Sequence, residues 1–162
     1  MTMRLYLQRD TSDISARYRI ADEKGELKYT VTGKRTPSGE SIRIRDLSGN
    51  PVCRIRSLGF SALSVYSISD GAESIRLNIA AANGRASARF RGISFYLRGD
   101  ILLGSYSILD ADTAVVCEAG KNYAEGCIQT DIFQEEREIF CLAAVVCIDS
   151  LSVGSVPALQ MT

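Results

Sequence analysis

The chain lacks histidine and tryptophan altogether, and only three of its 162 residues are proline. Without histidine, neither a Ser-His-Asp nor a Cys-His arrangement can activate a nucleophile, and the commonest general base near neutral pH is missing. The glycine-rich phosphate-binding loops of nucleotide-binding proteins are also absent. We therefore expect a protein that is not an enzyme, with no catalytic residues, no metal ligands and no cofactor. A carboxylate-based or lysine-based enzyme stays open, but the closest acidic pair, Asp110 and Asp112, lies in a segment typical of a turn.

The cysteines give no sign of a metal site or of a disulfide framework. Their number is odd and none belongs to a CxxC pair, so we expect buried, reduced side chains in a cytoplasmic protein. The first residues alternate in character instead of forming a charged segment followed by an apolar one, which argues against secretion. The five cysteines are Cys53, Cys117, Cys127, Cys141 and Cys147.

Long hydrophobic runs are scarce, with one exception near the C-terminus. Residues 139–148 are apolar at every position, and a segment without a polar face must be covered on all sides. The run falls well short of the ~20 residues needed to cross a bilayer, so we expect no transmembrane segment. Glu135, Glu136 and Glu138 precede it, where the positive end of a helix dipole favours acids. The sequence therefore predicts a buried helix over about 135–150.

A short alternating pattern that runs into a turn recurs along the rest of the chain. It reads aromatic residue or Ile, any residue, Ile, any residue, Asp, and it occurs at Tyr18–Asp22, Ile42–Asp46, Tyr66–Asp70 and Tyr106–Asp110. Alternation indicates a strand with one buried face, and Asp near Gly indicates a tight turn. The first three copies start 24 residues apart, a length that fits two strands and two connections. The repeat predicts an antiparallel meander.

The same patterns assign about twelve strands to one domain. This domain covers residues 1–153, and Gly154 with Pro157 predicts that residues 154–162 form a flexible tail. The predicted strands lie near residues 3–8, 15–22, 27–33, 40–46, 51–57, 62–69, 73–80, 86–91, 94–99, 103–110, 114–119 and 124–132.

The predicted fold is mostly β with one helix: a closed antiparallel barrel of about twelve strands around a central hydrophobic C-terminal α-helix. The helix fills the space that so many strands would leave open, and closure removes exposed sheet edges. Burial of each large apolar side chain is worth about 1.5–3 kcal/mol, so an exposed apolar helix would be costly. The alternative is a sandwich or an open sheet with the helix packed on one face.

The order of these segments resembles the LURP-one-related family, whose fold is similar to the tubby C-terminal domain and to the phospholipid scramblases. The resemblance extends from Met3 to about Leu151 and implies a twelve-stranded barrel around a central hydrophobic helix. Tubby domains bind phosphoinositide headgroups through basic side chains, but fold alone does not transfer function. The segments that carry the resemblance are Tyr18–Gly25, Val31–Lys34, Ile42–Asp46, Tyr96–Asp100, Tyr106–Asp110 and Leu142–Asp149.

Charge is unevenly distributed, although the formal net charge is zero. Residues 1–100 have 17 basic and 10 acidic side chains, whereas residues 101–162 have 2 basic and 9 acidic ones. Arginine outnumbers lysine 15 to 4, which favours anionic partners. Nucleic acid is not expected as a partner, because the net charge is zero and the basic residues are not interleaved with exposed aromatic ones.

One predicted hairpin concentrates arginine on a single face. A two-residue loop at 48–49 would place Arg43 opposite Arg54 and turn the alternate apolar residues toward the core. Like charges that face each other across strands are mildly destabilising. Acids of a neighbouring strand, solvent screening, or a bound phosphate or acidic lipid could offset this repulsion. The candidate anion-binding residues on the outer face of this hairpin are Arg43, Arg45, Arg54 and Arg56.

Two hypotheses for the function follow. The first is a non-enzymatic cytoplasmic module, peripheral at the membrane, that binds anionic membrane lipid, phosphoinositide-like headgroups or another phosphorylated ligand through these arginines. The second is a structural or protein-interaction domain that has a protein partner and no small ligand.

Overall fold

The computed structural model describes residues 2–37, 39–60, 63–122 and 126–161. Positions 62 and 124–125, at the predicted starts of two strands, and residue 162 of the predicted tail lie outside the described residues. Within the described ranges the chain forms twelve β-strands, a short 3-10 helix and one α-helix. The predicted fold class, mostly β with one helix, is confirmed.

The strands lie within a few residues of their predicted positions, because alternation of apolar and polar residues marks a half-buried strand. Their bounds are β1 Met3–Arg9, β2 Ala16–Asp22, β3 Leu27–Thr36, β4 Gly39–Arg45, β5 Pro51–Phe60, β6 Leu63–Ser69, β7 Ser74–Ala82, β8 Arg85–Arg91, β9 Tyr96–Asp100, β10 Ser105–Leu109, β11 Val115–Asn122 and β12 Cys127–Ile132.

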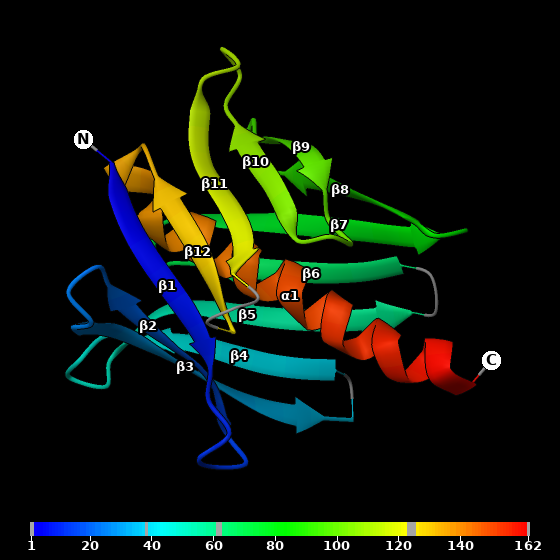
Figure 1. Ribbon diagram of the computed structural model, residues 1–162, viewed down its shortest axis with the longest axis horizontal. Helices are drawn as coiled ribbons and strands as arrows, with labels where there is room; N and C mark the ends of the chain where they lie inside the picture. Colours follow the sequence, from blue (N-terminus) through cyan, green and yellow to red (C-terminus); the bar gives the residue numbers. More distant parts are fainter. Residues whose placement is uncertain (1, 38, 61–62, 123–125, 162) are drawn as a thin grey trace.

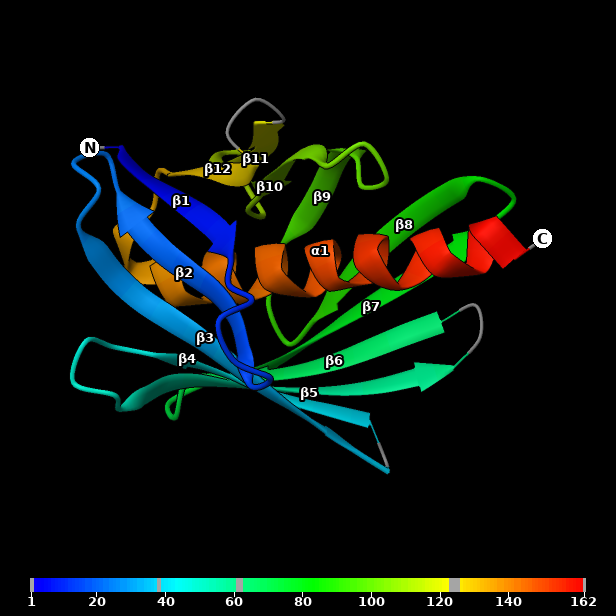
Figure 2. The ribbon, with the colours of Figure 1, turned by 60° about the horizontal axis from the view of Figure 1, so that its bottom comes forward.

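These strands form one antiparallel sheet in the order β8-β7-β6-β5-β4-β3-β2-β1-β12-β11-β10-β9. Pairing of β1 with β12 joins the two ends of the meander and wraps the sheet around the helix (Figures 1 and 2). Near the seam between the edge strands β8 and β9, the rings of Phe90 and Phe95 pack edge to face, with their centroids 5.7 Å apart. The guanidinium of Arg137 lies 5.9 Å from the centre of the Phe95 ring. Side-chain packing thus helps to complete a nearly closed barrel.

The C-terminal helix runs through the middle of this barrel (Figure 2). A 3-10 helix, η1 (Glu135–Arg137), leads into α1 (Glu138–Met161). Every side chain from Phe140 to Asp149 is buried, and Leu142 and Val146 are 0% exposed, which confirms the predicted central helix. Among the residues that the structure describes, no helix has both the length and the apolar character needed to span a membrane.

The helix ends later than the sequence predicts. It continues to Met161 instead of ending near residue 150. Gly154 and Pro157 suggested an earlier end, but a proline removes one backbone hydrogen bond and does not always terminate a helix. The backbone of residues 154–161 is therefore helical, and the mobility of this tail stays a prediction.

A buried carboxylate fixes the helix inside the barrel. Asp149 is 4% exposed and accepts hydrogen bonds from the guanidinium of Arg9, at 3.1–3.3 Å, and from the Tyr18 hydroxyl. The ammonium group of Lys121 lies 3.9 Å from the same carboxylate. Burial, together with the nearby charge of Asp149, raises the pKa of Tyr18 far above its usual value, so its hydroxyl stays protonated and can donate.

The Asp at the end of each repeat closes a turn at one end of the barrel. Asp22 and Asp46 each accept two backbone N–H groups of their own turn, at 2.9–3.0 Å. Asp70 and Asp110 do the same at 2.8–3.0 Å. Because successive strands alternate in direction, the turns after β2, β4, β6 and β10 share one end, which we call the acidic end (Figure 2). Helix α1 has its C-terminus at the opposite end, which we call the exit end (Figures 1 and 2).

Candidate functional site

The hairpin of β4 and β5 has the predicted pairing of Arg43 with Arg54, but its connection is longer than the predicted two-residue loop, because β4 ends at Arg45 and β5 begins at Pro51. Arg43 lies opposite Arg54 and Ile44 opposite Cys53, with a bulge at Arg45. Ile44 and Cys53 are buried, whereas Arg43 and Arg54 are exposed. The predicted alternation of apolar residues inward and arginines outward is thus confirmed, while the role of these arginines in binding stays a prediction.

Arg45 differs from the other three candidate residues because its side chain is engaged in the hairpin. Its guanidinium donates to the carbonyl oxygen of Gly49 at 2.9 Å and to the hydroxyl of Thr32 at 3.2 Å. The side chain is half-buried and braces the β4–β5 turn. Its guanidinium is therefore less available to a ligand than those of its neighbours.

The neighbours of the Arg43–Arg54 pair carry hydroxyl groups and no carboxylate. Arg43 is flanked by Thr32 on β3, and Arg54 by Ser69 on β6. Among the described residues, neither arginine forms an ion pair with Asp or Glu. Acids of an adjacent strand therefore do not offset the repulsion, which leaves solvent screening or a bound anion.

A second row of cations crosses the same face of the sheet. Arg56 is flanked by Ser41 on β4 and Ser67 on β6, and Ser67 is flanked by Arg76 on β7. Arg76 in turn lies opposite Arg91 on β8. Within the described residues, none of these three arginines forms an ion pair either. We call the following exposed residues the arginine wall: Arg43, Arg54, Arg56, Arg76 and Arg91.

The wall is hollowed between Arg56 and Arg76. These arginines and two serines, Ser41 and Ser67, line a depression of about 370 Å³, with Leu58 and Val65 among its apolar lining residues. One strand separates the two arginines, so their Cα atoms lie about 10 Å apart, and long side chains can converge over the strand between them. Sequence reasoning identified Arg56 but missed Arg76, because only the order and register of β5, β6 and β7 bring the two together.

The acid that lines this hollow is already paired. The carboxylate of Glu40 forms an ion pair with the guanidinium of Arg17, with 3.0 Å between Oε1 and Nη2. Gly33 makes room for that ion pair, since a Cβ at this position would lie 2.9 Å from the Nε atom of Arg17. Arg56 and Arg76 thus have no ion pair with a carboxylate among the described residues, and guanidinium and hydroxyl groups are suitable donors to phosphate or carboxylate oxygens.

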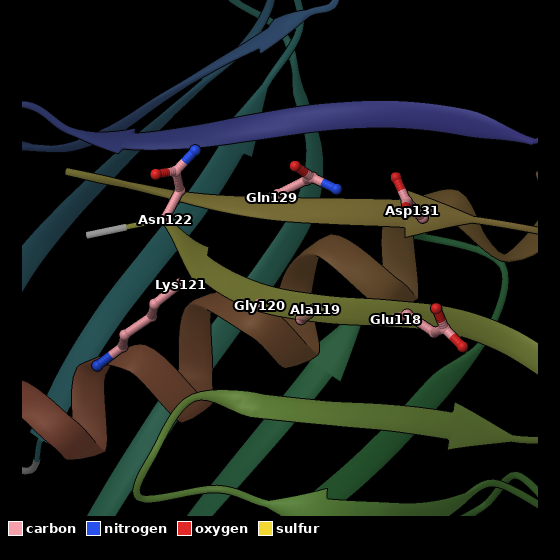
Figure 3. A pocket seen from close by; sticks show the side chains of 7 residues that line it. All are labelled: Glu118, Ala119, Gly120, Lys121, Asn122, Gln129 and Asp131. Carbon is pink, nitrogen blue, oxygen red and sulfur yellow. The ribbon is translucent and has the colours of Figure 1, made fainter. Parts of the chain in front are cut away.

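A larger hollow lies on the outer side of β11 and β12, but its charges are less suited to an anion. It measures about 420 Å³, and Glu118, Gln129 and Asp131 are among its lining residues (Figure 3). Asp131 is held by Arg4 at 2.7 Å. Lys121 points away from Gln129 and Asp131, toward the helix, in accord with its ion pair to Asp149. The candidate functional site is therefore the hollow of the arginine wall.

Two of the buried cysteines are poor nucleophiles in the folded barrel. Burial raises the pKa of Cys53 to about 12, with a smaller contribution from Asp70, and burial also raises the pKa of Cys147 well above its usual value. Both thiols stay protonated at neutral pH and are therefore poor nucleophiles. Four of the five cysteines are buried as predicted, whereas Cys127 is half-buried. Within the described part of the chain, no three His, Cys, Asp or Glu side chains gather as metal ligands do.

Comparison with known proteins agrees with this architecture. The model of the LURP-one-related family matches residues 3–149. An X-ray structure of a protein from Arabidopsis thaliana aligns over 93% of this chain and 91% of its own length, with a TM-score of 0.65 and 15% sequence identity. At that identity the likeness concerns the fold alone, and no curated protein matches the chain. Because the family match spans nearly the whole barrel, the chain belongs to the LURP-one-related family.

Proposed function

We propose that this protein is a non-enzymatic cytoplasmic module that binds phosphate-bearing headgroups of anionic lipids at a membrane surface. The observation that carries the proposal is the hollow between Arg56 and Arg76, whose two guanidinium groups have no acidic partner among the described residues. A phosphate there would accept hydrogen bonds from both arginines and from the serine hydroxyls. It would also reduce the repulsion between neighbouring cations of the wall.

The chemistry of the wall favours binding over catalysis. Arginine keeps its charge at any physiological pH and offers several fixed donors, which suits the recognition of phosphate. The buried thiols of Cys53 and Cys147 have raised pKa values and stay protonated. These features support a module that recognises an anion without transforming it.

Binding to vesicles tests the proposal. The protein should co-sediment with vesicles of phosphatidylcholine that contain phosphatidylserine and a phosphoinositide, and less with vesicles of phosphatidylcholine alone. Binding should weaken as salt is added, because salt screens exposed charges. Each basic residue near an anionic surface contributes about 1 kcal/mol, so neutralising two of them should weaken binding roughly 30-fold, and reversing their charge should weaken it further.

The decisive variant is Arg56→Glu with Arg76→Glu, and Arg43→Glu with Arg54→Glu tests the pair predicted from the sequence. A matched control is Arg19→Glu with Arg98→Glu, which changes the net charge equally at two exposed positions on β2 and β9. If the control weakens binding as much as the Arg56 and Arg76 variant, net charge acts without a defined site. Equal binding to neutral and acidic vesicles would refute recognition of anionic headgroups, and absence of binding to either would favour the protein-interaction hypothesis. Binding of a soluble inositol phosphate without vesicle binding would instead indicate a soluble phosphorylated ligand.

A further inference from the structure

An apolar patch lies beside the hollow, on the outer side of the β5–β6 hairpin. Leu58 is 49% exposed and Leu63 is 41% exposed, which is unusual for leucines in a sheet whose other face packs on a core. Leu58 faces Val65 across the ladder, and Leu63 faces Ala80 on β7. Leu58, Leu63, Val65 and Ala80 thus form one surface, which we call the leucine patch.

Cations border the leucine patch on two sides. Arg56 precedes Leu58 by two positions on the same face of β5. Arg89 on β8 lies opposite Asn78, which itself lies opposite Val65. Apolar side chains flanked by arginines match the boundary of an anionic bilayer, where headgroup phosphates lie above the hydrocarbon.

The position of the leucine patch selects one end of the barrel. The β5–β6 hairpin lies at the exit end, together with the C-terminus of α1 (Figures 1 and 2). Residues 151–161 of that helix include no Asp, Glu, Lys or Arg. Aspartates lie at both ends: the four turn aspartates of the repeat at the acidic end, and Asp10, Asp13 and Asp100 at the exit end. The leucine patch and its flanking arginines, and not the turn aspartates, therefore select the exit end as the side that faces a membrane.

We propose that the barrel docks on an anionic leaflet by its exit end, so that Leu58 and Leu63 enter the boundary between headgroups and acyl chains while Arg56 and Arg76 hold headgroup phosphates. This inference rests on the proposed lipid binding and adds an orientation and an inserted hairpin to it. Charge complementarity between the flanking arginines and the leaflet selects the membrane over a second copy of this chain, whose corresponding patch would bring the same cations together.

The absence of tryptophan from the chain offers a direct test, because a single introduced tryptophan would be the sole indole reporter. In Leu63→Trp, acidic vesicles should shift the emission to shorter wavelength, and brominated acyl chains should quench it. The control is Leu47→Trp, at a 67% exposed position in the β4–β5 turn at the acidic end, and its emission should not change. If Leu63→Trp fails to fold, as judged by circular dichroism, Leu58→Trp replaces it.

A second measurement separates insertion from electrostatic attraction. The double variant Leu58→Ala with Leu63→Ala should bind acidic vesicles roughly tenfold more weakly, about the effect of exposing one leucine side chain. Vesicle binding of the unaltered barrel without an emission shift at position 63 would overturn the inserted hairpin and leave the proposed lipid binding intact. Absence of vesicle binding would overturn both. A shift in Leu63→Trp that depends on protein concentration without vesicles would show that a second copy covers the patch, and would also overturn the inference.

Discussion

Replacing Asp149 with alanine should destabilise the protein by about 3 kcal/mol, because this buried carboxylate connects the helix to strands from both ends of the chain. Its loss leaves the hydroxyl of Tyr18 without its acceptor in a buried site, which costs about 1–3 kcal/mol. The side chain of Arg9 is 51% exposed and can turn toward water, so its contribution is small. Lys121 is 21% exposed, and in the variant its ammonium charge loses the attraction of the Asp149 carboxylate. The total falls at the lower end of the 3–5 kcal/mol typical of a broken buried ion pair.

Urea unfolding followed by circular dichroism measures this loss. In a domain of this size, 3 kcal/mol corresponds to a decrease of roughly 6–12 °C in the thermal midpoint. The control is Asp131→Ala, whose ion pair with Arg4 lies on the outer side of the barrel with the Arg4 side chain 41% exposed, and which should therefore cost less. Tyr18→Phe combined with Asp149→Ala should cost less than the sum of the single changes, because the two side chains share one hydrogen bond. Equal losses for Asp149→Ala and Asp131→Ala would refute the anchoring role of Asp149.

Three further predictions concern backbone strain, pH and the tail. Gly39→Ala should reduce the free energy of unfolding at least twice as much as Gly49→Ala, which should cost about 1 kcal/mol. The reason is that a Cβ at Gly39 would lie 1.9 Å from the carbonyl oxygen of Ser57, whereas a Cβ at Gly49 would meet nothing within 4 Å. Above pH 9 the stability should fall, because the folded state holds the pKa of Cys53 at about 12 whereas the unfolded thiol ionises near 9. The stabilisation from the protonated Cys53 thiol is complete below pH 9 and is lost at about 1.4 kcal/mol per pH unit toward pH 12. The urea midpoint of Cys53→Ala should therefore decline less steeply with pH than that of the unaltered protein, and an unchanged slope would contradict this account. Limited proteolysis should cleave within 154–162 before any strand, and a chain that ends at residue 153 should keep its thermal midpoint; initial cleavage within a strand would contradict the domain boundary.

The arginines illustrate how far the sequence reaches into the site. Alternation in β4 and β5, with a short turn between them, was sufficient to predict that Arg43 faces Arg54, because adjacent strands joined by a tight turn have a local register. The same reasoning could not assign Arg45 to its turn, since the bulge that redirects it depends on the detailed hairpin geometry. Nor could it pair Arg56 with Arg76 across an intervening strand.

The strands, the acidic turns and the burial of the apolar helix follow from the order of the residues, because they depend on residue periodicity and on the cost of exposing apolar side chains. The contacts between distant residues depend instead on the folded barrel. Asp149 contacts Arg9, which lies 140 positions earlier in the chain, and Tyr18, which lies 131 positions earlier. The hollow between Arg56 and Arg76 depends on the register of β5, β6 and β7. Such contacts depend on how the sheet curves and closes around its helix, and no local pattern encodes that geometry.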